Sequence, residues 1–183
     1  MTVQSPYSSR PAPGFHLFDA EPGQFACGYQ DYLAYVLWTG RGTLPALQRI
    51  QALNRHMNVS HPEGHVNVSF VGAGVAPPAE DARDGFKRVF TGGVSGVRAM
   101  AIILDGEGFW ASALRGAITN FRHSEAPRAG DMAVHVANSN EIAADWLGEQ
   151  LTWLMSKHVH PGRLLRTLTG AQQALAAAAA APA

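Results

Sequence analysis

Two glycines, Gly72 and Gly74, end a run of β-forming residues in the segment 66–78, VNVSFVGAGVAPP. A glycine-rich turn between a strand and a helix can bind phosphate, as it does in dinucleotide-binding units. That fingerprint needs a third glycine, which lets the helix pack tightly on the strand, and Pro77 stands at this position. Pro77 and Pro78 also delay the start of the helix, which withdraws its amide donors from the turn. We therefore expect the two glycines to shape a turn, and we expect no nucleotide cofactor.

Two carboxylates, Asp105 and Glu107, follow the most apolar run of the chain. In open α/β sheets, ligand sites usually lie where strands end. The simpler interpretation is that Asp105 forms a turn with Gly106 and caps the helix that follows. Asn138 follows the next predicted strand, residues 131–137, in the same way. The candidate ligand-binding residues, taken together, are Gly72, Gly74, Asp105, Glu107 and Asn138.

The eight histidines include two pairs with the spacing of metal ligands, His61 with His65 and His158 with His160. Zinc needs three or four converging nitrogen, sulfur or oxygen ligands, and one such pair does not supply them. His61 and His65 are better explained as residues that flank a loop. There is no Gly-x-Ser-x-Gly nucleophile elbow, and Cys27 has no recognisable catalytic partner. We expect neither a metal site nor a catalytic residue, and we lean against an enzyme.

Charge and composition limit the partners of the chain. Fourteen basic residues balance fourteen acidic ones, so no overall field attracts nucleic acid or an anionic membrane. The single cysteine excludes an internal disulfide and fits a reducing compartment. No apolar leader and no run of about eighteen apolar residues is present. We expect a cytoplasmic protein that has neither a nucleic-acid nor a membrane partner.

Strand and helix patterns alternate between residues 15 and 160. Strands are predicted at 15–19, 24–29, 31–40, 65–74, 97–106 and 131–137, and helices at 43–57, 78–90, 107–123 and 138–155. Thr43 is expected to cap the first helix, and Asn138 with Glu141 has the spacing of a capping box. This alternation predicts a single α/β domain over residues 15–160, with a mostly parallel sheet of four to six strands and helices packed against it.

The two ends of the chain differ from this middle part. Residues 1–14 contain Ser, Pro and Gly without an apolar period, which predicts a flexible N-terminal arm. Residues 161–183 predict a C-terminal helix that ends in an alanine-rich, disordered tail, because a bare alanine run buries too little surface to hold itself.

The segments YLAYVLWTGRGTLPALQRI, VNVSFVGAGV, AMAIILDGEGFWASALRGAITNF and MAVHVANSNEIAADWL resemble the anti-sigma-factor-antagonist group, which is also called STAS or SpoIIAA-like. The shared features are the run from Gly40 to Thr43, the strand before Asp105, and the positions Glu141, Ala143, Trp146 and Leu147. The resemblance covers about residues 24–155. It implies a sheet backed by helices and a binding or signalling role. Many members carry a phosphorylatable Ser or Thr after a middle strand, but GAGVAPPAED has no hydroxyl group there.

These observations predict a non-catalytic module that binds a protein, a peptide or a small ligand within a regulatory or biosynthetic complex. The alternative is a small enzyme or ligand carrier with a pocket near Gly72, Asp105 and Asn138. We also expect a homodimer, because the strands at 15–19 and 24–29 are short and suited to sheet edges, which can pair with a second copy.

Overall fold

The computed structural model describes residues 14–90, 96–104, 116 and 132–181. The expected arm at 1–14, apart from Gly14, and the expected helix at 107–123, apart from Gly116, lie outside the described residues. Asp105 and Glu107 lie outside them too.

One sheet of six strands organises the described residues, in the order β1-β2-β3-β4-β5-β6. The strands are β1 (His16–Glu21), β2 (Phe25–Gln30), β3 (Leu33–Trp38), β4 (His65–Val71), β5 (Val97–Leu104) and β6 (Ala133–Ala137). β1, β2 and β3 pair antiparallel, whereas β3, β4, β5 and β6 pair parallel. The predicted α/β domain with a mostly parallel sheet is therefore confirmed. The expectation that both early strands form edges is corrected for β2, which lies between β1 and β3.

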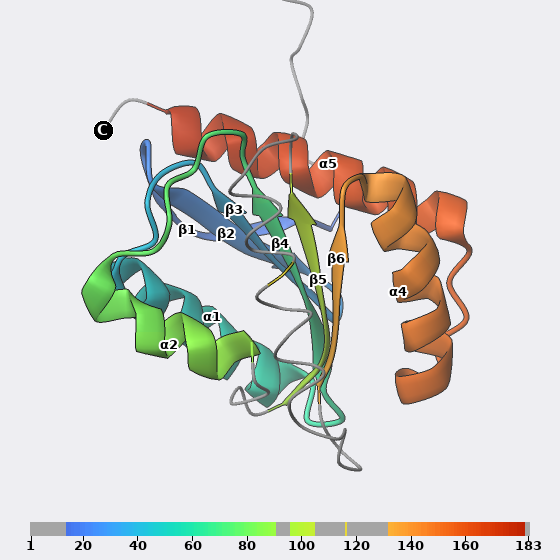
Figure 1. Cartoon of the computed structure of the whole chain (residues 1–183). Helices are drawn as coiled ribbons and strands as arrows, with labels where there is room; N and C mark the ends of the chain where they lie inside the picture. Colours follow the sequence, from blue (N-terminus) through green and yellow to red (C-terminus); the bar gives the residue numbers. More distant parts are fainter. Residues whose placement is uncertain (1–13, 91–95, 105–115, 117–131, 182–183) are drawn as a thin grey trace, which may run out of the picture.

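Helices cover both faces of this sheet (Figure 1). They are α1 (Leu44–Ser60) and α2 (Glu80–Phe90) on one face, and α4 (Asn140–Met155) and α5 (Pro161–Ala180) on the other. Successive side chains of a strand point to opposite faces, so each strand contributes to two separate cores. Among the described residues, no helix has both the length and the hydropathy that a membrane span requires.

The helix starts follow from capping side chains. Thr43 Oγ1 accepts a hydrogen bond from the Ala46 amide at 3.4 Å, which confirms the predicted N-cap of α1. The cap of α4 was predicted one residue too early. Ser139, not Asn138, accepts the Ile142 amide, at 3.3 Å, and Asn138 is exposed in the turn before it. The hydroxyl of Ser139 is sufficient for this role because it reaches an otherwise unpaired amide of the first turn.

The alanine run of the C-terminus continues α5 to Ala180, where the sequence led us to expect disorder. Ala171, Leu175 and Ala179 are buried in the same core as the sheet, and the amide of Gly23 donates to the Ala179 carbonyl at 3.0 Å. Contact with the sheet thus supplies the stabilisation that an isolated alanine helix lacks.

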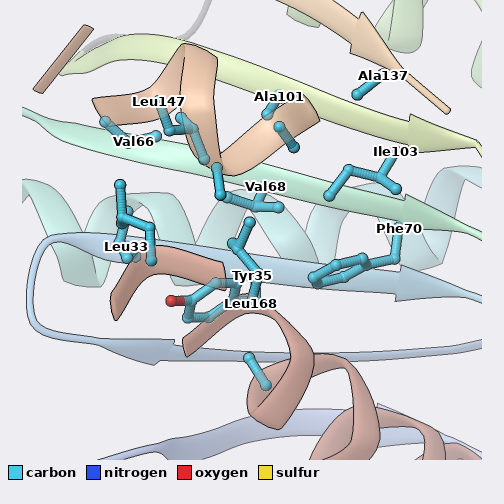
Figure 2. Packing of buried hydrophobic residues seen from close by; sticks show 14 of the residues in the cluster. Leu33, Tyr35, Val66, Val68, Phe70, Ala101, Ile103, Ala137, Leu147 and Leu168 are labelled. Carbon is cyan, nitrogen blue, oxygen red and sulfur yellow. The ribbon is translucent and has the colours of Figure 1, made fainter. Parts of the chain in front are cut away.

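The core under α4 and α5 is closely packed and apolar (Figure 2). Tyr35 and Phe70 stack with ring centroids 6.4 Å apart, Leu168 of α5 lies beside Tyr35, and Leu147 of α4 lies beside Val66. The β4 side chains that point to this face, Val66, Val68 and Phe70, are all apolar. The polar residues of β4 must therefore lie on the face that α1 covers.

Candidate functional site

A row of polar side chains lies on the α1 face of β4, near the middle of the sheet. His65 and Asn67 are buried, and Ser69 is half-buried. The residues between them, Val66 and Val68, point to the opposite core. The neighbouring rows of β3 and β5 on the α1 face are apolar. Buried polar groups normally have hydrogen-bond partners, so each member of this row calls for one.

His65 has its partner on α1. Its Nε2 lies 3.2 Å from Oδ1 of Asn54, which is also buried. A carboxamide oxygen can only accept a hydrogen bond, so Nε2 carries the proton. Burial lowers the pKa of His65 from 6.5 to about 4, and the imidazole is therefore neutral at neutral pH. His61 ends α1 and His65 begins β4, so the two do flank a loop as expected.

Both His65 and Asn67 have a buried atom without a hydrogen-bond partner among the described residues, Nδ1 of His65 and Oδ1 of Asn67, but only Asn67 lines a cavity. Its side chain is 7% exposed, and its Oδ1 is buried without a hydrogen-bond partner among the described residues. A buried carbonyl without a partner costs about 1–3 kcal/mol of folding free energy. Asn67 therefore imposes a penalty at the centre of the sheet.

Asn67 lines a cavity of about 90 Å³ between the sheet and helices α1 and α2. Strands β3, β4 and β5 supply one wall, including Val36, Met100 and Ile102, and α1 supplies Ile50. Most of the lining is apolar. The polar side chains in the described part of the wall are the following: Gln51, Asn54, Asn67 and Ser69.

Two aromatic rings close one end of the cavity. Trp38 at the end of β3 meets Phe86 of α2, with ring centroids 5.3 Å apart. Gly42 lies directly beneath Phe86, since a Cβ at this position would come within 2.7 Å of the ring. A glycine is thus required for α2 to approach the sheet closely enough to enclose the cavity.

The glycine loop after β4 also borders the cavity. The Gly72 amide donates to the Trp38 carbonyl at 3.0 Å, and a Cβ on Gly72 would lie 3.2 Å from that oxygen. Gly74 has a φ of +79°, which favours glycine. The conformation of the backbone therefore explains why both positions are glycine. The turn that they form places Val75 in the cavity wall.

The candidates from the sequence are not all brought together. Gly72 adjoins the cavity through its neighbours Val71 and Val75, whereas Gly74 has open space around it. Asn138 follows β6, is exposed, and does not line the cavity. Asp105 and Glu107 lie outside the described residues.

Sequence reasoning missed the polar wall of the cavity, although two signals pointed to it. The alternation in HVNVSFV places His65, Asn67 and Ser69 on one face of a strand that is covered on both sides. Asn54 occupies a position on the apolar face of α1, in helical register with Leu47 and the residues around it.

The described part of the cavity wall can bind, but it has no group suited to proton transfer. Its polar groups are carboxamides and a hydroxyl, and none of its described residues is acidic, basic or a thiol. Among the described residues, no three His, Cys, Asp or Glu side chains are grouped as a metal ion would need. Apolar contact and neutral hydrogen bonding are the interactions that this wall offers.

Comparisons with protein-family models, curated proteins and solved structures found no match to this chain. The resemblance to the STAS group therefore stays a prediction from the sequence.

Proposed function

We propose that the chain is a binding module that holds a small ligand in the cavity between α1, α2 and the sheet. The observation that carries this proposal is Asn67, a buried carboxamide whose oxygen has no partner among the described residues and which lines an apolar cavity. A ligand with a polar group can hydrogen-bond to this carboxamide in the cavity wall. Polar groups left unsatisfied in a native core often have a functional reason.

The neutral wall favours binding over catalysis. Proton transfer needs a group whose pKa lies near the working pH, and the described lining has none. The resemblance to the STAS group, whose members act as binding or signalling modules, supports the same choice. A role within a regulatory or biosynthetic complex follows from that resemblance and is part of the proposal.

A small enzyme is the second candidate, because of the position of β5. Leu104, the last residue of β5, pairs with Val71 of the cavity wall, and Asp105 is the next residue in the chain. Conversion of a bound ligand that Asp105→Asn abolishes would favour this second candidate over a binding module.

The homodimer expected from the sequence is also kept as a proposal. β1 ends the sheet on one side of the described residues, and its Leu17 and Phe18 are exposed. An exposed edge strand can pair with a second copy. Light scattering should therefore give about twice the chain mass of 19.5 kDa, and a mass of one chain at all concentrations would contradict the dimer.

A fragment screen by ligand-observed NMR tests the binding site. Val75→Phe places a ring in the cavity wall, whereas Val59→Phe makes the same change on a residue that is 84% exposed. Fragments that bind the native chain should bind Val59→Phe equally well and should lose affinity for Val75→Phe. Equal binding by both variants, or no binding to the native chain, would contradict the proposed site.

A further inference from the structure

The size of the cavity limits the buried part of a ligand. An apolar cavity of roughly 150 Å³ accommodates benzene, and the cavity beside Asn67 is about 90 Å³. The buried group is therefore smaller than an aromatic ring. A branched aliphatic group of roughly four carbons or fewer is the size that fits.

The charge of the wall limits the ligand further. No described residue of the lining carries a formal charge. An ion that entered this cavity would lose its hydration without a counter-charge, which costs far more than one hydrogen bond returns. The buried part of the ligand is therefore neutral.

The polar row determines which neutral group is recognised. The carboxamide of Asn67 and the hydroxyl of Ser69, two residues along the same face of β4, both line the cavity, and each can donate or accept a hydrogen bond. A ligand hydroxyl can exchange a hydrogen bond with either group. An aliphatic alcohol combines this group with the apolar body that the rest of the wall requires.

We propose that the cavity recognises a neutral aliphatic alcohol, or the hydroxyl-bearing aliphatic end of a larger molecule, with Asn67 as the specificity-determining residue. This inference rests on the proposed binding function, because it names the ligand class of the same cavity. It adds a preference for an alcohol over a hydrocarbon of the same shape, which a purely apolar cavity would not have.

Two compounds of the same shape test the selection. Isopropanol and isobutane differ by exchange of a hydroxyl for a methyl group, and isopropylammonium adds a charge to the same skeleton. The dissociation constants of the first two are measured by NMR with the native chain and with Asn67→Leu. Because the two compounds differ in hydration, the informative quantity is the ratio of their affinities in each protein.

We expect Asn67→Leu to weaken isopropanol relative to isobutane by roughly tenfold, the effect of one hydrogen bond. Isopropylammonium should not bind. Asn67→Val, which suits a strand, replaces Asn67→Leu if the leucine variant does not fold. An unchanged affinity ratio, or binding of the cation, would overturn the alcohol class but leave the binding site in place. If neither neutral compound binds the native chain, the proposed binding function is contradicted as well.

Discussion

Replacement of Asn67 by leucine should stabilise the protein, although it changes a buried residue of a central strand. Leucine has the same number and branching of side-chain heavy atoms as asparagine, its extra volume can enter the adjoining cavity, and the neighbouring wall is apolar. The change removes a buried carbonyl without a partner among the described residues, whose desolvation costs about 1–3 kcal/mol. We therefore expect a gain of about 1 kcal/mol or more in the free energy of unfolding. For a chain of this length, the melting temperature rises by about 2–4 °C for each kcal/mol.

The matched control is Asn54→Leu, on the opposite wall of the same cavity. Asn54 Oδ1 accepts the hydrogen bond of the buried His65, so this change leaves an imidazole N–H unsatisfied and should cost about 1–3 kcal/mol. Urea unfolding followed by circular dichroism measures both variants against the native chain. A loss of stability in Asn67→Leu comparable to that in Asn54→Leu would mean that Asn67 has a structural hydrogen bond, and would refute its role as a ligand group.

Three further predictions concern residues outside the ligand contact. The folded-state pKa of His65 is lowered from 6.5 to about 4, so the stability due to its neutral form is complete above about pH 6.5 and is lost as the pH falls towards 4. Unfolding midpoints across this range should fall in the native chain and in His158→Gln, but much less in His65→Gln; equal slopes in all three would contradict this. Burial raises the pKa of Cys27 to about 12, so a thiol reagent should label it only at the rate of unfolding, and rapid labelling of the folded protein would show an error in its burial. In urea unfolding, Leu147→Ala should lower the free energy of unfolding by about 2–5 kcal/mol. Ile142→Ala should lower it by under about 1 kcal/mol, because the Ile142 side chain is 46% exposed. Similar losses in the two variants would mean that the face of α4 assigned to the sheet is wrong.

The sheet could be predicted because apolar period and capping chemistry are local properties. The continuous apolar run of β5 and the Thr43 cap of α1 are both visible in short windows of sequence. The face of α4 could not be predicted in the same way. The apolar period of α4 includes Leu147 and Leu151, which are buried, but it also includes Ile142, which is 46% exposed, and it omits the buried Ala143 and Ala144. Small side chains let the helix approach the sheet, and hydrophobicity alone gives them little weight.

Trp146 shows the same difficulty. Hydrophobicity alone places it on the inner face of α4, and it is half-buried there, packed against the core and stacked on His135 of β6 with ring centroids 5.1 Å apart. The pairing depends on which strand lies beneath α4, and this is decided by the topology of the sheet.

The cavity could be predicted only in part. The location beside a strand end follows from the α/β fold, and Val71 and Val75, on either side of Gly72, line the cavity. A ligand contact of Gly72 itself stays a prediction. Asn54 and Asn67 were missed because they line the same cavity from two different elements, α1 and β4. Whether a polar residue on an apolar face has a hydrogen-bond partner depends on the tertiary structure. The sequence alone does not give the distance between the two side chains.

The side-chain amide of Asn67 gives the most direct test of ligand binding in the cavity. Isopropanol is titrated into the folded protein, and the side-chain amide signals of Asn67 and of the exposed Asn138 are followed by two-dimensional NMR. We predict that the Asn67 signal shifts and saturates while the Asn138 signal stays in place. A stationary Asn67 signal, or shifts of both signals that grow without saturation, would contradict the account.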